Sequence, residues 1–558
     1  MGLFYSSSLE EFSCCEKFGL TPYFNLKTTK ILDQRFFYYL AGLTLLVSFP
    51  IPPSLKLRRI SRGGLEPALS VAEWGGVKKQ KYQINFAKLH TFFTFPLTPP
   101  TPSLEKRGKK ARGGKRVKGV SLIRLNPIII AMKVIISKTT FITGKVLVPA
   151  SKSQTIRGLV FALLASGQSI LTNPLNSEDT EIAIKVCRAL GAKIILKKNK
   201  IKFHHSGLSV KPKVNTGNSG ITTRFILPIL GLRKNHTRPS VFNCGSQMRA
   251  RPIKALVIAL NNLGMEIQYL KKSGQCPLLV KGKLVGGDVE VDGTTSQYLS
   301  SLLISLPLVE KNSIVRVKNL HERPYVEMTL KWLDDLGIKY FHKKLGQTDI
   351  YKIPGKQTYS QFQKCIPGDF SSASTLIVAS CLLGKKVVIE GLDLNDQQGD
   401  KKIIDILQKM GAKIEIFKSK LIINQSKGLR GMKIDANSIP DLVPTLAVLG
   451  TQAKGRTQIL NVQQARIKET DRLHSMTVGL RVLGAKIQEL SDGLVVYKSD
   501  LKGAKVKGFN DHRTVMALTL AGMLAEGKTI ISDAQAINKT FPNFFIVMKK
   551  LGVNLKIL

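Results

Sequence analysis

The chain has 558 residues, of which 43% are hydrophobic and 22% are charged. It is therefore long enough for more than one domain, and its composition excludes a wholly disordered, a collagen-like or a polytopic membrane protein. Lys and Arg number 85 against 37 Asp and Glu, and the net charge of +48 favours an anionic partner: nucleic acid, an anionic membrane surface or an acidic substrate.

The seven Cys include no CxxC pair, and the eight His do not cluster. We therefore expect no metal site, no disulfide framework and a reducing compartment, the cytoplasm.

Residues 1–131 show no sustained helical or strand period. Their uncharged stretch, residues 36–55, meets Pro50 after about 14 residues, whereas a membrane-spanning helix needs about 20. We expect an unstructured extension, or translated sequence upstream of a true start at Met132, and no membrane partner.

From Met132 onward, a Leu or Met followed by Gly recurs at intervals of 68 to 74 residues. Each of these glycines follows an amphipathic stretch and precedes a strand-like run, a pattern that predicts a helix C-terminus turning into a β-strand. The glycines are Gly191, Gly264, Gly337, Gly411, Gly484 and Gly552.

A second landmark keeps the same period. Short polar turns precede apolar helical stretches at residues 151–153, 218–220, 294–296, 369–372, 440–441 and 510–512. Each unit of about 70 residues therefore reads strand, helix, strand, helix, strand. Six units exceed one core, so we expect two domains of three units each.

The helix openings suggest anion binding, because a helix N-terminus presents free N–H groups and the positive end of its dipole. Any single opening is explained as well by ordinary N-capping through Ser, Thr, Asn or Asp. Six openings in register, several with cations beside them, favour an anion site.

Two segments of the second half are candidates for catalysis. Lys468, Glu469 and Arg472 share a face if they are helical, although an exposed salt-bridge ladder has the same pattern. Asp441 follows Pro440 in an apolar neighbourhood, where it is either a base or an N-cap.

In this order, the motifs PASKSQTIR, GNSGITTR, DGTTSQYL, GDFSSAS, IPDLVPTL, RIKETDRL, FNDHRTVMA and NKTFPNFF resemble the 5-enolpyruvylshikimate-3-phosphate synthase family, and the resemblance covers residues 132–558. It implies an α/β fold of two domains, each an inside-out barrel of three βαβαββ repeats. The domains would comprise residues 151–366, and residues 132–150 plus 367–558, after an extension of residues 1–131.

The resemblance also implies a reaction and residue roles. The family transfers the enolpyruvyl group of phosphoenolpyruvate to the 5-hydroxyl of shikimate 3-phosphate with loss of phosphate, without metal or organic cofactor. Matching positions give catalytic roles to Asp441, Glu469 and Lys468. Asp179 matches a hinge-region carboxylate. The positions that match substrate-binding residues are Lys152, Ser153, Arg157, Gly220, Arg224, Thr295, Ser296, Gln297, Gln464, Lys468, Arg472, Arg513 and Lys539.

Several positions depart from the family pattern. Gln247 stands where an Arg is usual, which leaves Arg249 or Arg251 to compensate, and Glu322 stands where a phosphate-binding Ser is common. Gln464 replaces an Asn, while Ile221 and Phe225 replace a Thr and a Pro. These departures affect expected substrate affinity more than reaction type.

Two other functions stay open. The sister enzyme that transfers enolpyruvyl to UDP-N-acetylglucosamine shares the fold, although KETDR and NDHR favour the shikimate branch. A nucleic-acid-binding protein would suit the charge, but the sequence has no basic stripe interleaved with aromatic residues. We expect a monomer with small-molecule substrates and no nucleic-acid partner.

Overall fold

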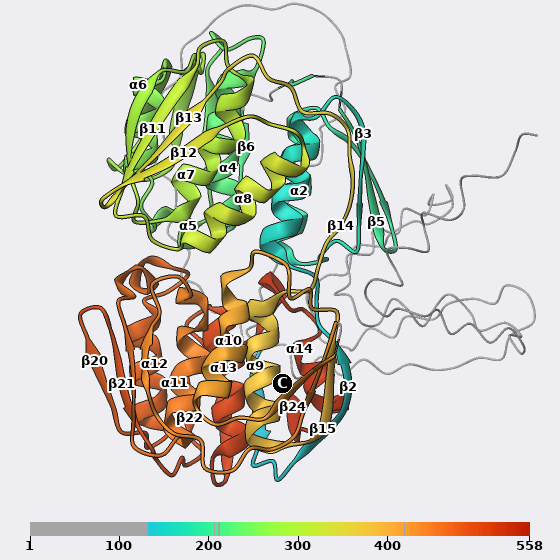
Figure 1. Ribbon diagram of the computed structural model, residues 1–558, viewed down its shortest axis with the longest axis vertical. Helices are drawn as coiled ribbons and strands as arrows, with labels where there is room; N and C mark the ends of the chain where they lie inside the picture. The colour runs from blue at the N-terminus through green and yellow to red at the C-terminus, as the bar shows by residue number, and fades with distance from the viewer. Residues whose placement is uncertain (1–131, 206, 210–212, 418) are drawn as a thin grey trace, which may run out of the picture. The chain divides into compact units, whose positions relative to one another are not determined.

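The computed structural model describes residues 132–205, 207–209, 213–417 and 419–558, which fall in one compact unit (Figure 1). The predicted extension, residues 1–131, lies outside the described residues. Within the described part, the strands form six four-stranded sheets, in agreement with the six repeats predicted from the sequence.

Three sheets come from the first half of the described chain. In spatial order they are β14 (Gln363–Cys365), β3 (Gly167–Thr172), β5 (Lys200–His205) and β4 (Lys193–Lys197); β6 (Lys213–Asn215), β7 (Ser240–Asn243), β9 (Leu278–Gly282) and β8 (Met265–Tyr269); and β10 (Asp288–Asp292), β11 (Ser313–Lys318), β13 (Thr348–Ile353) and β12 (Phe341–Leu345). Their helices are α2 (Lys152–Leu164), α3 (Glu178–Ala189), α4 (Gly220–Ile229), α5 (Ser246–Arg249), α6 (Lys254–Asn262), α7 (Ser296–Ser305) and α8 (Arg323–Asp335).

Three further sheets use the second half and the first two strands. They are β16 (Ile414–Phe417), β17 (Lys420–Ile423), β15 (Gly384–Glu390) and β2 (Ile142–Leu147); β18 (Lys433–Asp435), β19 (Arg456–Leu460), β21 (Gly493–Tyr497) and β20 (Ile487–Leu490); and β22 (Lys505–Val506), β23 (Lys528–Ile531), β1 (Val134–Ser137) and β24 (Leu555–Ile557). Their helices are α9 (Phe370–Leu383), α10 (Lys402–Lys409), α11 (Val443–Gln452), α12 (Arg472–Val482), α13 (His512–Leu524) and α14 (Phe544–Lys550).

Every described sheet has one parallel pair and two antiparallel pairs. In the third sheet, for example, Val315 of β11 lies opposite Val289 in the parallel pair and opposite Tyr351 in the antiparallel pair. The residue pattern alone predicted three strands for each unit, whereas each sheet has four. The strand predicted after Gly337 is β12, whereas the strand that follows it along the chain, β13, was not predicted.

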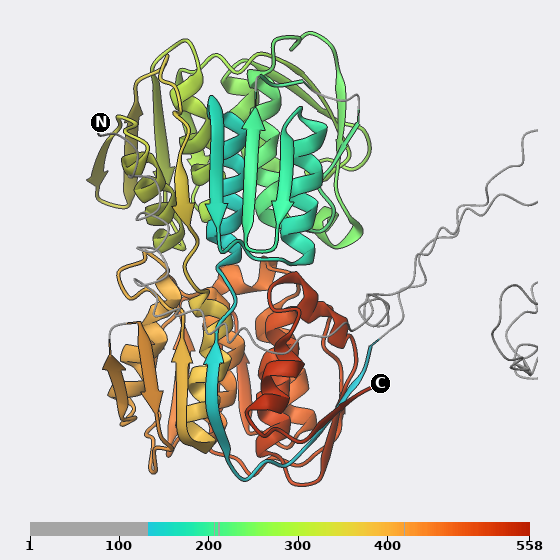
Figure 2. The ribbon, with the colours of Figure 1, turned by 90° about the vertical axis from the view of Figure 1, so that its right-hand side faces the viewer.

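The buried apolar side chains form two separate cores. One core draws on residues 150–366, which we call the first lobe, and the other on residues 134–148 and 370–555, which we call the second lobe. The helices α2, α4 and α7 are buried almost all round in the first lobe, as are α9, α11 and α13 in the second. Such helices are central elements, and Figure 2 shows the strands around them.

The helix ends follow the sequence prediction. All six repeat glycines have left-handed backbones, with φ between +70° at Gly337 and +103° at Gly411. At the end of α3, the amide of Ala192 donates to the Cys187 carbonyl at 3.1 Å, which is the 6→1 hydrogen bond of a Schellman turn. A glycine is favoured there because a Cβ atom makes this backbone costly.

The predicted helix openings are also confirmed. Asp369 and Asp511 accept backbone hydrogen bonds at the start of α9 and α13, and Ser151 caps α2. One opening differs: Pro440 and Asp441 form a 3₁₀ turn, Pro440–Leu442, that precedes α11.

The chain passes between the lobes through two segments that lie side by side. Ala150 and Gly368 form an antiparallel bridge. The amide of Ser151 donates to the Pro367 carbonyl at 2.8 Å, and the amide of Asp369 donates to the Pro149 carbonyl at 2.8 Å. The first lobe is therefore inserted between β2 and α9 of the second lobe.

Candidate active site

A polar pocket is lined by side chains from both lobes, many of them at helix N-termini. Its lining residues are Lys152, Ser153, Arg157, Asp179, Gly220, Ile221, Arg251, Ser296, Gln297, Glu322, Tyr325, Asp441, Lys468, Glu469, Arg472 and His512. The openings of α2, α4, α7, α12 and α13 all contribute to this wall. The pocket therefore combines fixed cations, ionisable carboxylates and the N-termini of several helices.

The first two turns of α2 supply two cations. Lys152 Nζ lies 3.3 Å from Asp179 Oδ2, and both side chains are almost fully buried. Arg157 is fully buried, donating from Nε to Thr329 Oγ1 at 2.9 Å and from Nη2 to the Tyr325 carbonyl at 2.7 Å. Burial lowers the pKa of Arg157 to about 10, so the guanidinium is still charged at neutral pH.

Asp441 is held by two guanidinium groups. Its Oδ1 pairs with Arg472 Nη1 at 2.5 Å, its Oδ2 pairs with Arg513 Nη2 at 3.1 Å, and Tyr325 Oη donates to Oδ2 at 3.2 Å. Burial opposes ionisation of this carboxyl, but the charges of Arg513, Arg472 and Lys468 outweigh it and hold its pKa well below the ordinary value. Asp441 is therefore an ionised carboxylate at the pocket wall.

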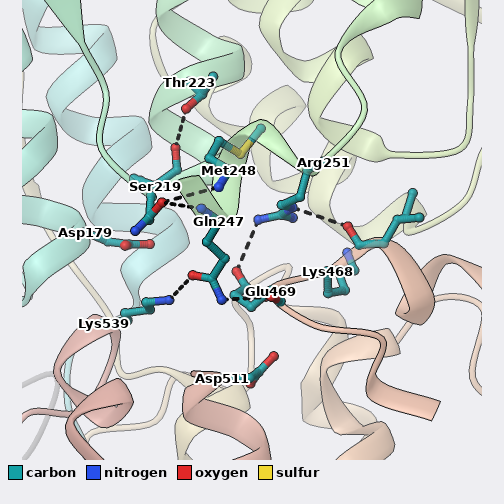
Figure 3. Close-up of polar contacts among 12 residues, drawn as sticks. Asp179, Ser219, Thr223, Gln247, Met248, Arg251, Lys468, Glu469, Asp511 and Lys539 are labelled. Carbon is teal, nitrogen blue, oxygen red and sulfur yellow. Dashed lines mark hydrogen bonds and ion pairs between the residues drawn. The ribbon is translucent and has the colours of Figure 1, made fainter. Parts of the chain in front are cut away.

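Glu469 is a second ionised carboxylate in the pocket. Its Oε2 lies 2.9 Å from Arg472 Nη2 and its Oε1 lies 3.4 Å from Arg251 Nη1. Burial raises its pKa, but Arg251, Arg472 and Lys152 more than offset that effect, so the pKa lies well below the ordinary value. Figure 3 shows the contact between Arg251 and Glu469, with Lys468 nearby.

Arg472 organises this part of the pocket. Besides Asp441 and Glu469, it contacts Asp511 through Nε at 2.9 Å, so one guanidinium meets three carboxylates. Burial alone would lower its pKa, yet the carboxylates of Asp511, Asp441 and Glu469 raise it well above the ordinary value. The exposed ladder considered for this segment is wrong, because Arg472 is only 1% exposed.

Lys468 pairs with a carboxylate from the other lobe, Glu322. The Oε2 atom of Glu322 accepts hydrogen bonds from Ser296, from its hydroxyl at 2.8 Å and from its amide at 3.3 Å. Glu322 is 1% exposed and has a left-handed backbone with φ of +55°. It thus occupies donors at the N-terminus of α7.

Gln247 links the two lobes. Its Nε2 donates to the Glu469 carbonyl at 2.8 Å and to the Asn510 carbonyl at 3.2 Å, while its Oε1 accepts from Lys539 Nζ (Figure 3). Of the two arginines expected to compensate for the absent cation, Arg251 lines the pocket and Arg249 does not. The Gln247 side chain thus both donates and accepts hydrogen bonds across the two lobes, whereas a cation at this position could only donate.

Five predicted binding residues are not among the residues that line the pocket. Arg224 donates to Gln297 Oε1 at 2.7 Å and to the Pro252 carbonyl at 3.0 Å, and Thr295 caps α7. Arg513 reaches the site through Asp441, and Lys539 reaches it through Gln247. Gln464 donates to the Asn437 carbonyl at 2.8 Å. The other predicted residues, Lys152, Ser153, Arg157, Gly220, Ser296, Gln297, Asp441, Lys468, Glu469 and Arg472, all lie on the wall.

The structure adds three groups that the sequence did not assign. Tyr325 Oη lies between Asp441 and Asp400, at 3.2 Å and 3.4 Å from their Oδ2 atoms. Burial and the neighbouring charge of Asp441 raise the pKa of Asp400 to about 7. Burial holds the pKa of His512 well below its ordinary value, so this ring is neutral, and neither of its nitrogens has a protein partner. No local sequence signal indicates that Tyr325, Asp400 or His512 belongs to the site.

Two further properties bear on the kind of site. Among the described residues, no group of three or more His, Cys, Asp or Glu side chains is arranged to hold a metal ion. No helix in the described ranges is long and apolar enough to cross a membrane.

Known proteins resemble this chain in sequence and in fold. Residues 136–548 match the family model of EPSP synthase (3-phosphoshikimate 1-carboxyvinyltransferase). The 3-phosphoshikimate 1-carboxyvinyltransferase of Acetivibrio thermocellus is 46% identical over 418 residues, which are 74% of this chain and 97% of that relative. The enzyme of the same name from Methanocaldococcus jannaschii is 40% identical over 76% of this chain and 99% of its own.

A solved EPSP synthase from Acinetobacter baumannii superposes with a TM-score of 0.64 at 23% identity, over 77% of this chain and all of that one. This match confirms the predicted fold class. With a family match across most of residues 132–558 and relatives aligned over nearly their whole length, this chain belongs to the EPSP synthase family.

Proposed function

We propose that this protein transfers the enolpyruvyl group of phosphoenolpyruvate to the 5-hydroxyl of shikimate 3-phosphate and releases phosphate, a step of aromatic amino-acid biosynthesis. The observation that carries this proposal is one pocket holding several buried cations together with two ionised carboxylates, Asp441 and Glu469. The names of the relatives support the shikimate acceptor over UDP-N-acetylglucosamine.

The cations suit two anionic substrates. Lys152, Arg157, Arg251, Lys468 and Arg472 all line the pocket. Each charge-assisted hydrogen bond to a phosphate or carboxylate contributes about 1.5–3 kcal/mol. We assign the sugar phosphate to the openings of α2 and α7, and phosphoenolpyruvate to the opening of α4 and the cations facing it. Arg224, Arg513 and Lys539 are further cations close to this site.

The reaction needs a base for the acceptor hydroxyl, and we assign Asp441 to this step. As the 5-hydroxyl oxygen attacks the carbon that carries the phosphate, its proton passes to an Asp441 oxygen. In the described structure Arg472 and Arg513 hold this carboxylate ionised and weakly basic. A bound substrate anion that shares these guanidiniums weakens their hold and raises the basicity of Asp441.

The reaction also needs an acid at the methylene carbon, and we assign that proton to the Lys468 ammonium. Addition gives a tetrahedral adduct, with a methyl group where the methylene was. In the elimination step the bond between this carbon and the phosphate oxygen breaks, one methyl proton returns to the protein, and the proton held by Asp441 passes to the departing phosphate, so that no net proton stays on the protein. Glu469 lies beside Lys468 in sequence and is ionised, so it can accept the methyl proton.

The domain division is proposed as well. Residues 151–366 would form one domain, and residues 132–150 with 367–558 the other. The two separate apolar cores, which change over at residues 148–150 and 366–370, support this division. A monomeric state, a cytoplasmic location and the absence of a nucleic-acid partner stay predictions.

A phosphate-release assay tests the proposed function. We expect release only when phosphoenolpyruvate and shikimate 3-phosphate are both present, and none when UDP-N-acetylglucosamine replaces the sugar phosphate. Lys468→Met should abolish release, whereas Lys454→Met, a change at an exposed lysine of the same lobe, should preserve it. Release with UDP-N-acetylglucosamine, or none with either acceptor, would refute the assignment.

A further inference from the structure

Glu322 places a carboxylate among donors that suit a bound anion. Its Oε2 accepts hydrogen bonds from the hydroxyl and the amide of Ser296, at 2.8 Å and 3.3 Å, and its Oε1 accepts one from the Lys468 ammonium. Two of these donors belong to the first turn of α7 and the third comes from the other lobe. A hydroxyl, a helix amide and an ammonium form a typical phosphate-binding set.

The local backbone presents Glu322 to the pocket at a cost. The residue is 1% exposed, immediately precedes α8 and has φ of +55° and ψ of +37°. A left-handed backbone is unfavourable for a side chain with a Cβ atom, by about 1 kcal/mol or more. Such strain persists only where surrounding contacts enforce it, and here those contacts are Ser296 and Lys468.

A phosphate dianion cannot share these donors with a carboxylate. Two anions within hydrogen-bonding distance of the same atoms repel strongly in a buried site. Ser296 is among the residues to which the proposed function gives the sugar phosphate. Either the carboxylate moves away or the phosphate binds weakly, and in both cases binding has to overcome the contacts of Glu322.

We propose that Glu322 is a specificity-determining residue whose carboxylate competes with the phosphate of the sugar substrate for the same donors, Ser296 and Lys468. Its carboxylate holds Ser296 and Lys468 before the substrate binds, and the substrate phosphate displaces it. Displacement also releases the Lys468 ammonium, which the proposed reaction requires. This inference rests on the proposed function, because it takes Ser296 as a ligand of the sugar phosphate.

Equilibrium binding to the full-length protein tests the inference with two probes. Shikimate 3-phosphate carries the phosphate, and shikimate lacks it but has the same ring. For Glu322→Ser and Glu322→Gln we expect the Kd for shikimate 3-phosphate to fall by about tenfold or more, which corresponds to about 1.4 kcal/mol. The Kd for shikimate should change less than threefold. Glu327→Gln, at an exposed position of α8, is the matched control and should alter neither.

A purely structural role gives the opposite result. If Glu322 only supports Ser296 and Lys468, both variants will bind shikimate 3-phosphate with unchanged or weaker affinity, and that result overturns the inference. Equal tightening for shikimate also overturns it, because the effect would not depend on the phosphate. Glu322→Gln preserves side-chain size and therefore keeps the test valid if the Ser variant does not fold.

The two hypotheses fail in different ways. If the unmodified protein neither binds shikimate 3-phosphate nor releases phosphate, the proposed function fails. If the unmodified protein is active and its Glu322 variants bind the sugar phosphate no more tightly, only the role of Glu322 fails.

Discussion

Replacing Asp400 by Asn should make the protein more stable at alkaline pH than the parent. The Asp400 side chain is buried, its Oδ2 accepts from Tyr325 Oη at 3.4 Å and from Ser371 Oγ, and its Oδ1 has no protein partner. Burial and the nearby Asp441 charge raise its pKa from 3.8 to about 7. Asn keeps the shape of the side chain and an acceptor oxygen but never ionises.

The sign and size of the effect follow from proton linkage. The folded state holds this proton up to about pH 7, whereas the unfolded chain loses it near pH 3.8, so stability is lost as the pH rises through this window. Between pH 5 and pH 8 this carboxyl should remove about 2.5 kcal/mol from the free energy of unfolding. The Asn variant lacks this loss, and groups that titrate in both proteins cancel in the comparison.

Urea unfolding of both proteins at pH 5 and pH 8 provides the measurement. The free-energy difference between variant and parent should move by about 2.5 kcal/mol in favour of the variant over this range. Asp405→Asn, at an exposed carboxyl on α10, should show no such change. A difference that does not depend on pH would refute the raised pKa of Asp400.

Three other predictions concern catalysis, chain geometry and the extension. Asp441→Asn and Glu469→Gln should each lower turnover by about 10²–10⁴-fold in the phosphate-release assay, with a lower melting temperature because each change leaves buried guanidinium groups without a charged partner, and near-normal turnover in both would exclude their acid–base roles. Gly411→Ala should destabilise by about 1 kcal/mol in urea unfolding, because its φ of +103° disfavours a Cβ although space is open, and an unchanged midpoint would contradict this. A chain of residues 132–558 should be as active as the full-length chain; loss of activity would make the extension part of the enzyme.

Local features of the sequence predicted most of the fold. A glycine after each apolar helix and a capping residue before the next depend only on neighbouring backbone atoms, so their period gave six repeats and both ends of the main helices. The strands β1, β2 and β14 pair with strands that are distant in the sequence, and no local sequence signal predicts this pairing. Only the resemblance indicated that the first strand completes the second lobe.

The site was predicted in part, for a similar reason. Cations and carboxylates at helix openings could be assigned because the fold brings those openings together. Tyr325 and Asp400 could not, because their roles arise from a contact between α8 and a 3₁₀ turn of the other lobe, Gly399–Lys401. The sequence also could not indicate the contacts of Arg224, whose guanidinium donates to Gln297 Oε1 and to the Pro252 carbonyl.

The insertion of one lobe into the other has a consequence for biosynthesis. Of the described strands, β1 and β2 leave the ribosome first, but β1 pairs with β23 and β24, whose residues are made more than 380 residues later. The first lobe has all its strands once β14 is translated, and at about 5–20 residues per second the ribosome leaves it many seconds to fold. Until their partner strands are made, β1 and β2 stay unpaired, and unpaired strand edges are prone to aggregate. The second lobe closes only after the last strand emerges, so we expect chaperone demand and the effect of destabilising mutations on yield to be concentrated there.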